Sequence, residues 1–104
     1  MAYDEELAER IRARVSGATE KKMFGGLAFL VNGNMAVAAS GQGGLLVRVD
    51  PAESPELVRT TSARPMEMRG RTMDGWLRVD VKGDDELAAW VDRGVSYART
   101  LPPK

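Results

Sequence analysis

The sequence predicts an α+β domain with the order helix, three strands, helix, two strands, helix. Two apolar runs flank Asn32-Gly33-Asn34, and Asn-Gly supplies the positive φ angles that a two-residue type I′ hairpin turn requires. Residues 76–81 alternate apolar with polar side chains, which is typical of a strand with one buried face. Residues 84–101 repeat apolar side chains at helical spacing, which is typical of a helix with one buried face. A chain of 104 residues suits a single domain, spanning 1–104.

A first helix is predicted to begin at Asp4, whose side chain can cap the free backbone N–H groups of a helix start. Acidic residues follow at once, where they complement the positive end of the helix dipole. An apolar stripe then recurs at every fourth position, at Leu7, Ile11 and Val15. Ser16-Gly17 is the predicted end, because glycine readily takes the left-handed conformation that closes a helix.

The hairpin strands are predicted near residues 22–31 and 34–40, with Asn32-Gly33 as the connecting turn. Gly33-Asn34 remains open as an alternative turn, which would shift the register of the pairing. Gly25-Gly26 interrupts the first strand, and paired glycines there indicate a bulge, a bend or a close approach of the backbone.

Both faces of this hairpin are apolar. The Asn32-Gly33 turn predicts two cross-strand pairs on one face, Leu30 with Met35 and Ala28 with Val37. It predicts a second face that consists of Leu27, Phe29, Val31, Ala36 and Ala38. Because a half-exposed antiparallel strand would alternate apolar with polar side chains, we expect a helix to cover one face and a second helix or a second subunit to cover the other.

The remaining elements are, in chain order, a loop at 41–44, a strand at 45–50, a short helix at 55–61, strands at 66–69 and 76–81, and a helix at 84–101. Ser54-Pro55 is typical of a helix start, although residues 50–53 offer a competing start. The last strand is expected to bury its apolar side chains. Its opposite face carries Trp76, Arg78 and Asp80, and this is either a solvated face or a partner surface.

The composition excludes several classes of function. The chain contains no cysteine and no histidine, so thiolate catalysis, disulfides and Cys-type zinc sites are ruled out, and the commonest general base is missing. We therefore expect a protein that is not an enzyme. The acidic N-terminus lacks the apolar core of a secretory signal, and no run is long enough to span a membrane, which predicts a cytoplasmic protein.

Two motifs that resemble ligand sites are better explained by local structure. Gly41-Gln42-Gly43-Gly44 lies between two strands and lacks the Lys-Ser/Thr and the following helix of a phosphate loop, so it is interpreted as a turn. Asp84-Asp85-Glu86 opens a helix, where acids complement the helix dipole. Glu67, Asp74 and Asp80 match no known ligand spacing. No catalytic residue, metal or cofactor is predicted.

A local basic surface is the one indication of nucleic-acid binding. Lys and Arg together number 15, as do Asp and Glu, so the formal net charge is zero and any such role depends on a patch. Trp76 lies beside these cations in the sequence and could stack on a base. The alternative is that the cations solvate strand edges and discourage aggregation. The candidate contacts are Lys21, Lys22, Arg69, Arg71 and Arg78.

The segment Lys22-Met23-Phe24-Gly25-Gly26, with the apolar run and Asn-Gly turn that follow it, resembles the N-terminal domain of the TfoX family, bacterial proteins linked to the regulation of natural competence. Ala63-Arg64-Pro65-Met66, Gly75-Trp76 and both chain ends also resemble small single-domain members. The resemblance implies a two-layer α-β3-α-β2-α sandwich like that of type III secretion chaperones, a fold often found as a dimer. Longer members add a C-terminal domain, and we expect this protein to be of the kind without it.

The resemblance also implies a regulatory protein. We therefore expect a non-catalytic domain that acts through protein contacts, forms a homodimer and takes part in transcriptional regulation of the competence type. Its protein partner is unidentified, and no membrane contact is expected. The alternative is a nucleic-acid-binding accessory protein that uses the basic residues above. The candidate interface residues are Phe29, Val31 and Trp76.

Overall fold

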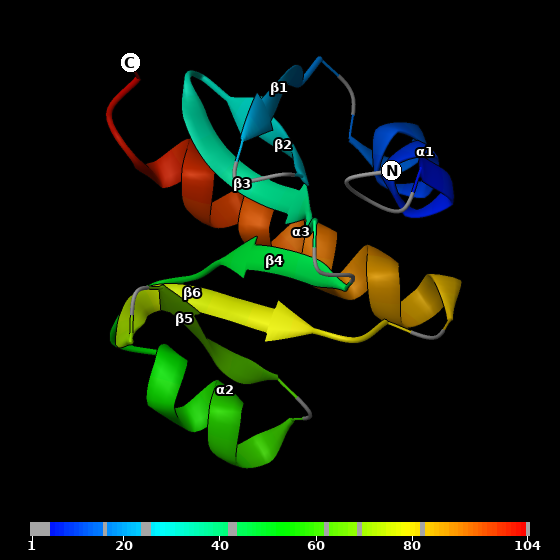
Figure 1. The fold of residues 1–104 in the computed structure, drawn as a ribbon. Helices are drawn as coiled ribbons and strands as arrows, with labels where there is room; N and C mark the ends of the chain where they lie inside the picture. The colour runs from blue at the N-terminus through cyan, green and yellow to red at the C-terminus, as the bar shows by residue number, and fades with distance from the viewer. Residues whose placement is uncertain are drawn as a thin grey trace.

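The structure is a computed structural model, and it describes residues 5–15, 17–23, 26–41, 44–61, 63–68, 70–81 and 83–103. Within these residues the chain forms three helices and one six-stranded sheet (Figure 1). In chain order the elements are α1 (Glu5–Arg14), β1 (Thr19–Met23), β2 (Gly26–Val31), β3 (Asn34–Ala39), β4 (Leu45–Arg48), α2 (Ser54–Thr60), β5 (Arg64–Met68), β6 (Arg71–Val79) and α3 (Asp84–Thr100). The predicted α+β class with an antiparallel sheet is confirmed.

The strands lie in the order β1-β2-β3-β4-β6-β5, and every neighbouring pair is antiparallel. In the view of Figure 1, α3 crosses behind β3 and β4, and α2 lies at the lower end beside β5 and β6. Apolar residues of all three helices pack into the same hydrophobic cluster on one face of the sheet. The helices therefore form one layer and the sheet forms the other.

The predicted hairpin turn is present. Asn32 and Gly33 have φ angles of 54° and 81°, the two positive values that a type I′ turn needs. Leu30 pairs with Met35 as expected. Ala28, however, pairs with Ala38, and the expected pairing with Val37 is wrong.

A bulge in β3 explains the difference. Phe29 pairs with Val37 whereas Leu30 pairs with Met35, so one extra residue, Ala36, is accommodated in β3. Ala36 and Val37 both contribute to the cluster beneath the helices. Ala38 consequently lies on the opposite face from the one that simple alternation predicts.

The predicted first strand of the hairpin is in fact two strands. β1 pairs with β2 from Thr19 with Leu30 to Met23 with Gly26, so the sheet has one strand more than expected. The Thr-Glu-Lys-Lys stretch of β1 has no apolar alternation, which is why the pattern did not reveal it. A Cβ atom at Gly26 would lie 2.2 Å from the carbonyl oxygen of Ala39, which confirms a close approach of the backbone at this glycine.

The core lies between the sheet and α3. The predicted apolar stripe of α3 is buried, with Val91 and Ala98 fully enclosed. Among the described residues, Phe29 is the largest side chain that is buried to this degree, at 1% exposed. Gly94 lets α3 approach β3 closely, because a Cβ atom there would lie 2.6 Å from the carbonyl oxygen of Ala36. Among the helices of the described residues, none has the length and the apolar character that crossing a bilayer requires.

Candidate functional site

The face of the sheet away from the helices carries a second, separate hydrophobic cluster. None of the described residues in this cluster belongs to a helix. We call this surface the outer face and define it by its apolar residues: Ala28, Leu30, Met35, Ala38, Leu46, Met66 and Trp76. The alanines, Leu46 and Met66 form a buried floor, and Leu30, Met35 and Trp76 are half-buried around it.

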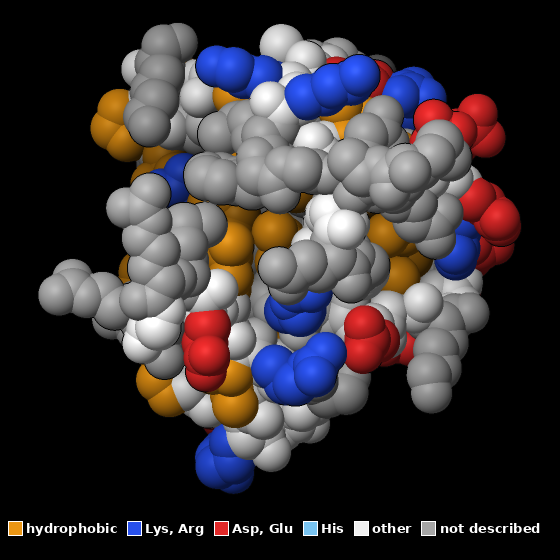
Figure 2. All heavy atoms as spheres, viewed as in Figure 1, with side chains coloured by type: hydrophobic (Ala, Val, Ile, Leu, Met, Phe, Trp, Pro, Cys, Tyr) orange, Lys and Arg blue, Asp and Glu red, His pale blue; other side chains and the backbone are white. Residues whose placement is uncertain are grey.

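Cationic side chains share the outer face with these apolar residues. In antiparallel pairs, directly opposed residues point to the same side of the sheet. Lys21 is paired with Ala28, and Arg78 is paired with Leu46 and Arg64, which places all three cations on the outer face. Arg48 is paired with Trp76. Figure 2 shows Lys and Arg side chains above and below the orange side chains at the centre of this view.

Two contacts hold cations against this surface. The guanidinium of Arg48 lies over the ring of Trp76, 5.6 Å from the ring centroid, which is the geometry of a cation–π interaction. Arg78 donates a hydrogen bond of 3.3 Å from Nη2 to the hydroxyl oxygen of Ser40. The carboxylate of Asp80 also lies on the outer face and forms an ion pair of 3.2 Å with Arg64.

The structure divides the predicted nucleic-acid contacts between the two faces. Lys21 lies on the outer face, whereas Lys22 is paired with Leu27 and therefore lies on the helix side. Arg78 also lies on the outer face, but β1 and β6 are four strand spacings apart, roughly 19 Å. Arg71 is placed by its backbone in β6, and Arg69 lies outside the described residues.

The three predicted interface residues do not share a surface. Phe29 is 1% exposed in the cluster beneath the helices, so its side chain is enclosed within the chain. Val31 is half-buried and packs against the same cluster. Trp76 lies on the outer face, where its side chain is half-buried and partly accessible.

The family motif lies at the junction of β1 and β2. Lys22 is exposed, the backbone of Met23 pairs with Gly26, and Phe24 and Gly25 lie outside the described residues. The role that the structure supports for Gly26 is conformational, because a side chain there would meet the backbone of β3.

Arg48 was not predicted from the sequence as a member of this surface. The signal for Arg48 was present, because residues 45–49 alternate and Leu46 and Arg48 therefore point away from the core. No local pattern reveals that β4 pairs with β6 instead of β5. That order brings Arg48 against Trp76 and Leu46 against Arg78.

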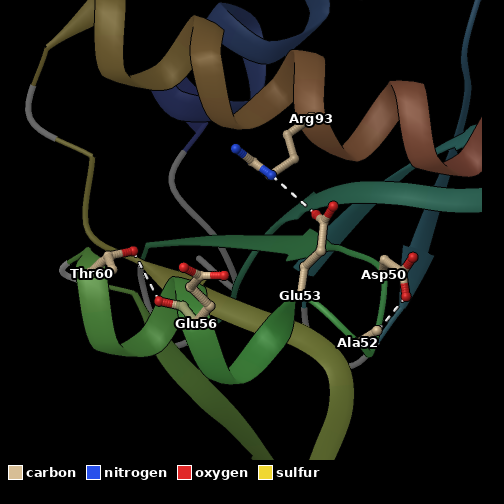
Figure 3. A network of polar contacts seen from close by, with 6 residues as sticks. All are labelled: Asp50, Ala52, Glu53, Glu56, Thr60 and Arg93. Atoms are coloured by element: carbon tan, nitrogen blue, oxygen red, sulfur yellow. Dashed lines mark hydrogen bonds and ion pairs between the residues drawn. The ribbon is translucent and has the colours of Figure 1, made fainter.

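A shallow hollow of about 510 Å³ lies on the helix side, between the entry to α2 and the surface of α3. Its carboxylates already have partners. Asp50 accepts a hydrogen bond of 2.9 Å from the backbone N–H of Ala52, and Glu53 pairs with Arg93 at 3.3 Å (Figure 3). The third carboxylate, Asp92, pairs with an arginine of α1.

Ion pairs on the helix side shift three pKa values. Hydrogen bonds from Arg14 lower the pKa of Asp92, and the same contact raises the pKa of Arg14. Hydrogen bonds from Arg12 likewise lower the pKa of Glu20. A lowered carboxyl pKa is the opposite of what a general acid needs at neutral pH. Among the described residues, no three His, Cys, Asp or Glu side chains are grouped as metal ligands.

Fold and surface together define a small α+β domain whose most distinctive feature is an apolar and cationic sheet face. The family model of the TfoX N-terminal domain matches residues 10–98, which is most of the chain, and the protein belongs to this family. Membership indicates a regulatory, competence-related domain. Neither a curated protein nor a solved structure matches the chain.

Proposed function

We propose that this protein is a non-catalytic regulatory domain of the cytoplasm that acts through protein–protein contacts, in transcriptional regulation of the competence type. Family membership supports the regulatory setting. The observation that carries the mode of action is the outer face, where Leu30, Met35 and Trp76 are half-buried with no helix packed on them among the described residues. Contiguous apolar surface outside the core is characteristic of interaction sites.

The regulatory role is tested by deleting the gene in the source cell and comparing transcripts with those of the parent strain. We expect a defined set of transcripts to change and to return when the wild-type gene is restored. Affinity capture from the same cells, with mass spectrometry, should recover a specific protein partner. Unchanged transcripts together with no recovered partner would contradict the proposal.

The homodimer is part of the proposal, and its support is membership of the family, whose fold is often found as a dimer. Sedimentation velocity at micromolar concentration measures the oligomeric state directly. We expect a species of twice the chain mass, and a strictly monomeric species would contradict this part.

The second candidate function is nucleic-acid binding, which the cations Lys21, Arg48 and Arg78 on one face favour. Labelled DNA and RNA titrated at low and moderate salt should then bind with a marked salt dependence. The double change Lys21→Glu with Arg48→Glu, both on the outer face, should abolish that binding. Absence of binding at low salt excludes this function.

A further inference from the structure

The charges of this net-neutral chain are sorted between its two sides. On the helix side, arginines engage acids: Arg10 with Asp84, Arg12 with Glu20, Arg14 with Asp92, Arg59 with Glu56, and Arg93 with Glu53. Further acids of α1 and α3 form no ion pair among the described residues: Glu5, Glu6, Glu9, Asp85 and Glu86. In Figure 2, red side chains gather at the right margin, the end at which α1 lies in Figure 1.

The outer face has the opposite balance. Lys21, Arg48, Arg64 and Arg78 lie on it, and Asp80 is the one carboxylate on it among the side chains that the structure describes. Arg48 contacts the Trp76 ring and has no acidic partner in the described part of the chain. Positive potential therefore coincides with the apolar cluster, and a complementary partner must supply negative charge and apolar side chains together.

A second copy of this chain does not meet that requirement at this surface. A symmetric dimer that joins two outer faces would bring the cations of one copy against those of the other. Like charges opposite one another across an interface are strongly unfavourable. A homodimer of this protein would consequently be expected to use another surface.

The side chains of the outer face favour a protein partner over a nucleic acid. Surfaces that bind single-stranded nucleic acid stack successive bases on several exposed aromatic rings. The described outer face offers one aromatic ring, Trp76, which the guanidinium of Arg48 already contacts. Its other apolar members are Ala, Leu and Met, and flexible methionine side chains such as Met35 and Met66 adapt well to apolar side chains of a protein partner.

We propose that the outer face binds an acidic amphipathic segment of a partner protein, with Leu, Ile or Phe on one side and Asp or Glu on the other. The apolar side of the segment lies on Leu30, Met35 and Trp76, and its carboxylates face Lys21 and Arg48. This inference rests on the proposed function, because it names the surface and the partner chemistry of that interaction domain.

The test is a titration of the ¹⁵N-labelled protein followed by its amide NMR signals. The probe is a synthetic peptide of about twenty residues, with Leu at the helical spacing of three and four and Asp or Glu elsewhere. We expect signals of Ala28, Ala38 and Leu46 to shift, and the affinity to fall with added salt. A peptide with the same Leu positions but Lys in place of the acids should leave these signals unchanged.

Two neighbours on β1 provide a matched pair of variants. Lys21→Glu and Lys22→Glu make the same charge change on the same strand, but Lys21 lies on the outer face and Lys22 on the helix side. Lys21→Glu with Arg48→Glu should weaken the acidic peptide by about tenfold or more, since the reversed charges then repel it. Lys22→Glu with Arg59→Glu makes the same total charge change away from the outer face and should bind like wild type.

Three results would overturn the proposal. The first is that no amide signal shifts at acidic peptide concentrations up to about 1 mM, the range of very weak binding. The second is that the shifted signals belong to the helices. The third is that oligothymidylate or oligouridylate binds the same face more tightly than the acidic peptide does. The transcript experiment separates this inference from the proposed function. If the deletion leaves the transcripts unchanged while the peptide still binds the outer face, the regulatory role alone is refuted. If the deletion alters the transcripts and a gene carrying Lys21→Glu with Arg48→Glu restores them as well as wild type does, the role of this surface alone is refuted.

Discussion

Asn34 at the start of β3 donates a hydrogen bond of 3.0 Å from Nδ2 to the backbone carbonyl of Pro102, which is 68 residues further along the chain. Asn34 is 2% exposed and Pro102 lies at the surface, so the contact is partly buried. The hairpin and the end of the chain are therefore joined by a specific polar contact, which anchors the segment that follows α3.

Replacing Asn34 should loosen this anchor. Asn34→Ala removes the donor and leaves the carbonyl of Pro102 without it, which should lower the free energy of unfolding by about 1 kcal/mol. Urea unfolding measures the loss. Asn34→Asp keeps the shape but cannot donate when ionised, so it should be at least as destabilising. Wild-type behaviour of both variants would show that the contact contributes nothing.

A methyl group at Gly94 should be destabilising even though it lies in a helix. In an exposed helix interior, Gly→Ala stabilises by about 1 kcal/mol. At Gly94 the new Cβ would lie 2.6 Å from the Ala36 carbonyl oxygen and 2.8 Å from Val37 Cγ1. Gly94→Ala should therefore lower the free energy of unfolding by about 1–3 kcal/mol, the cost of overpacking. Ser96→Ala, exposed on the same helix, is the control and should be neutral or slightly stabilising.

The Arg14–Asp92 ion pair, at 2.6 Å between α1 and α3, should make a pH-dependent contribution to stability. Arg14 lowers the pKa of Asp92 below its ordinary value of 3.8, so the folded protein holds this proton less tightly than the unfolded chain. The contribution is accordingly present above pH 3.8 and is lost as the pH falls through the lowered pKa of the folded state.

A double-mutant cycle of Arg14→Gln and Asp92→Asn measures this contribution. The coupling free energy should be favourable at pH 7 and vanish in acid, and NMR titration of the Asp92 carboxyl should give a pKa below 3.8. A coupling that is unchanged across the acid range would contradict the assignment.

Phe29 and Trp76 should respond differently to truncation, because they lie on opposite faces of the sheet. Phe29→Ala opens a cavity in the core and should cost about 3–5 kcal/mol of the free energy of unfolding. Trp76→Ala removes a half-buried side chain of the outer face and should cost clearly less. Chemical denaturation compares the two variants. Equal losses would place Trp76 in the structural core instead of a surface.

The sequence predicted the parts of the fold that depend on local patterns. The stripe of α3 identified its buried side, and Asn32-Gly33 identified the turn and the pairing of Leu30 with Met35. The bulge at Ala36 was not predictable. β3 consists largely of small apolar residues, so shifting its pairing with β2 by one residue still places apolar side chains on both faces. β1 was hidden for the opposite reason: Lys21 and Lys22 lack apolar alternation, and pairing with β2 holds this strand in the sheet.

The candidate surface was predictable only in part. Alternation placed Trp76 and Arg78 on the face of β6 away from the core, and the structure agrees. Phe29 was placed with the interface because both hairpin faces looked alike. The position of α3 determines which of the two hairpin faces is buried in the core. That position depends on the close packing at Gly94, which no local sequence pattern reveals.

The sorting of charge between the helix side and the outer face implies an electric dipole in a chain whose formal net charge is zero. Opposite ends of neighbouring molecules attract one another in dilute buffer, and dissolved ions weaken that attraction within about 10 Å at 0.1 M ionic strength. Solubility near neutral pH should therefore rise as salt is added. The same dipole would orient the molecule on approach to a charged partner, so that the outer face leads toward an acidic one.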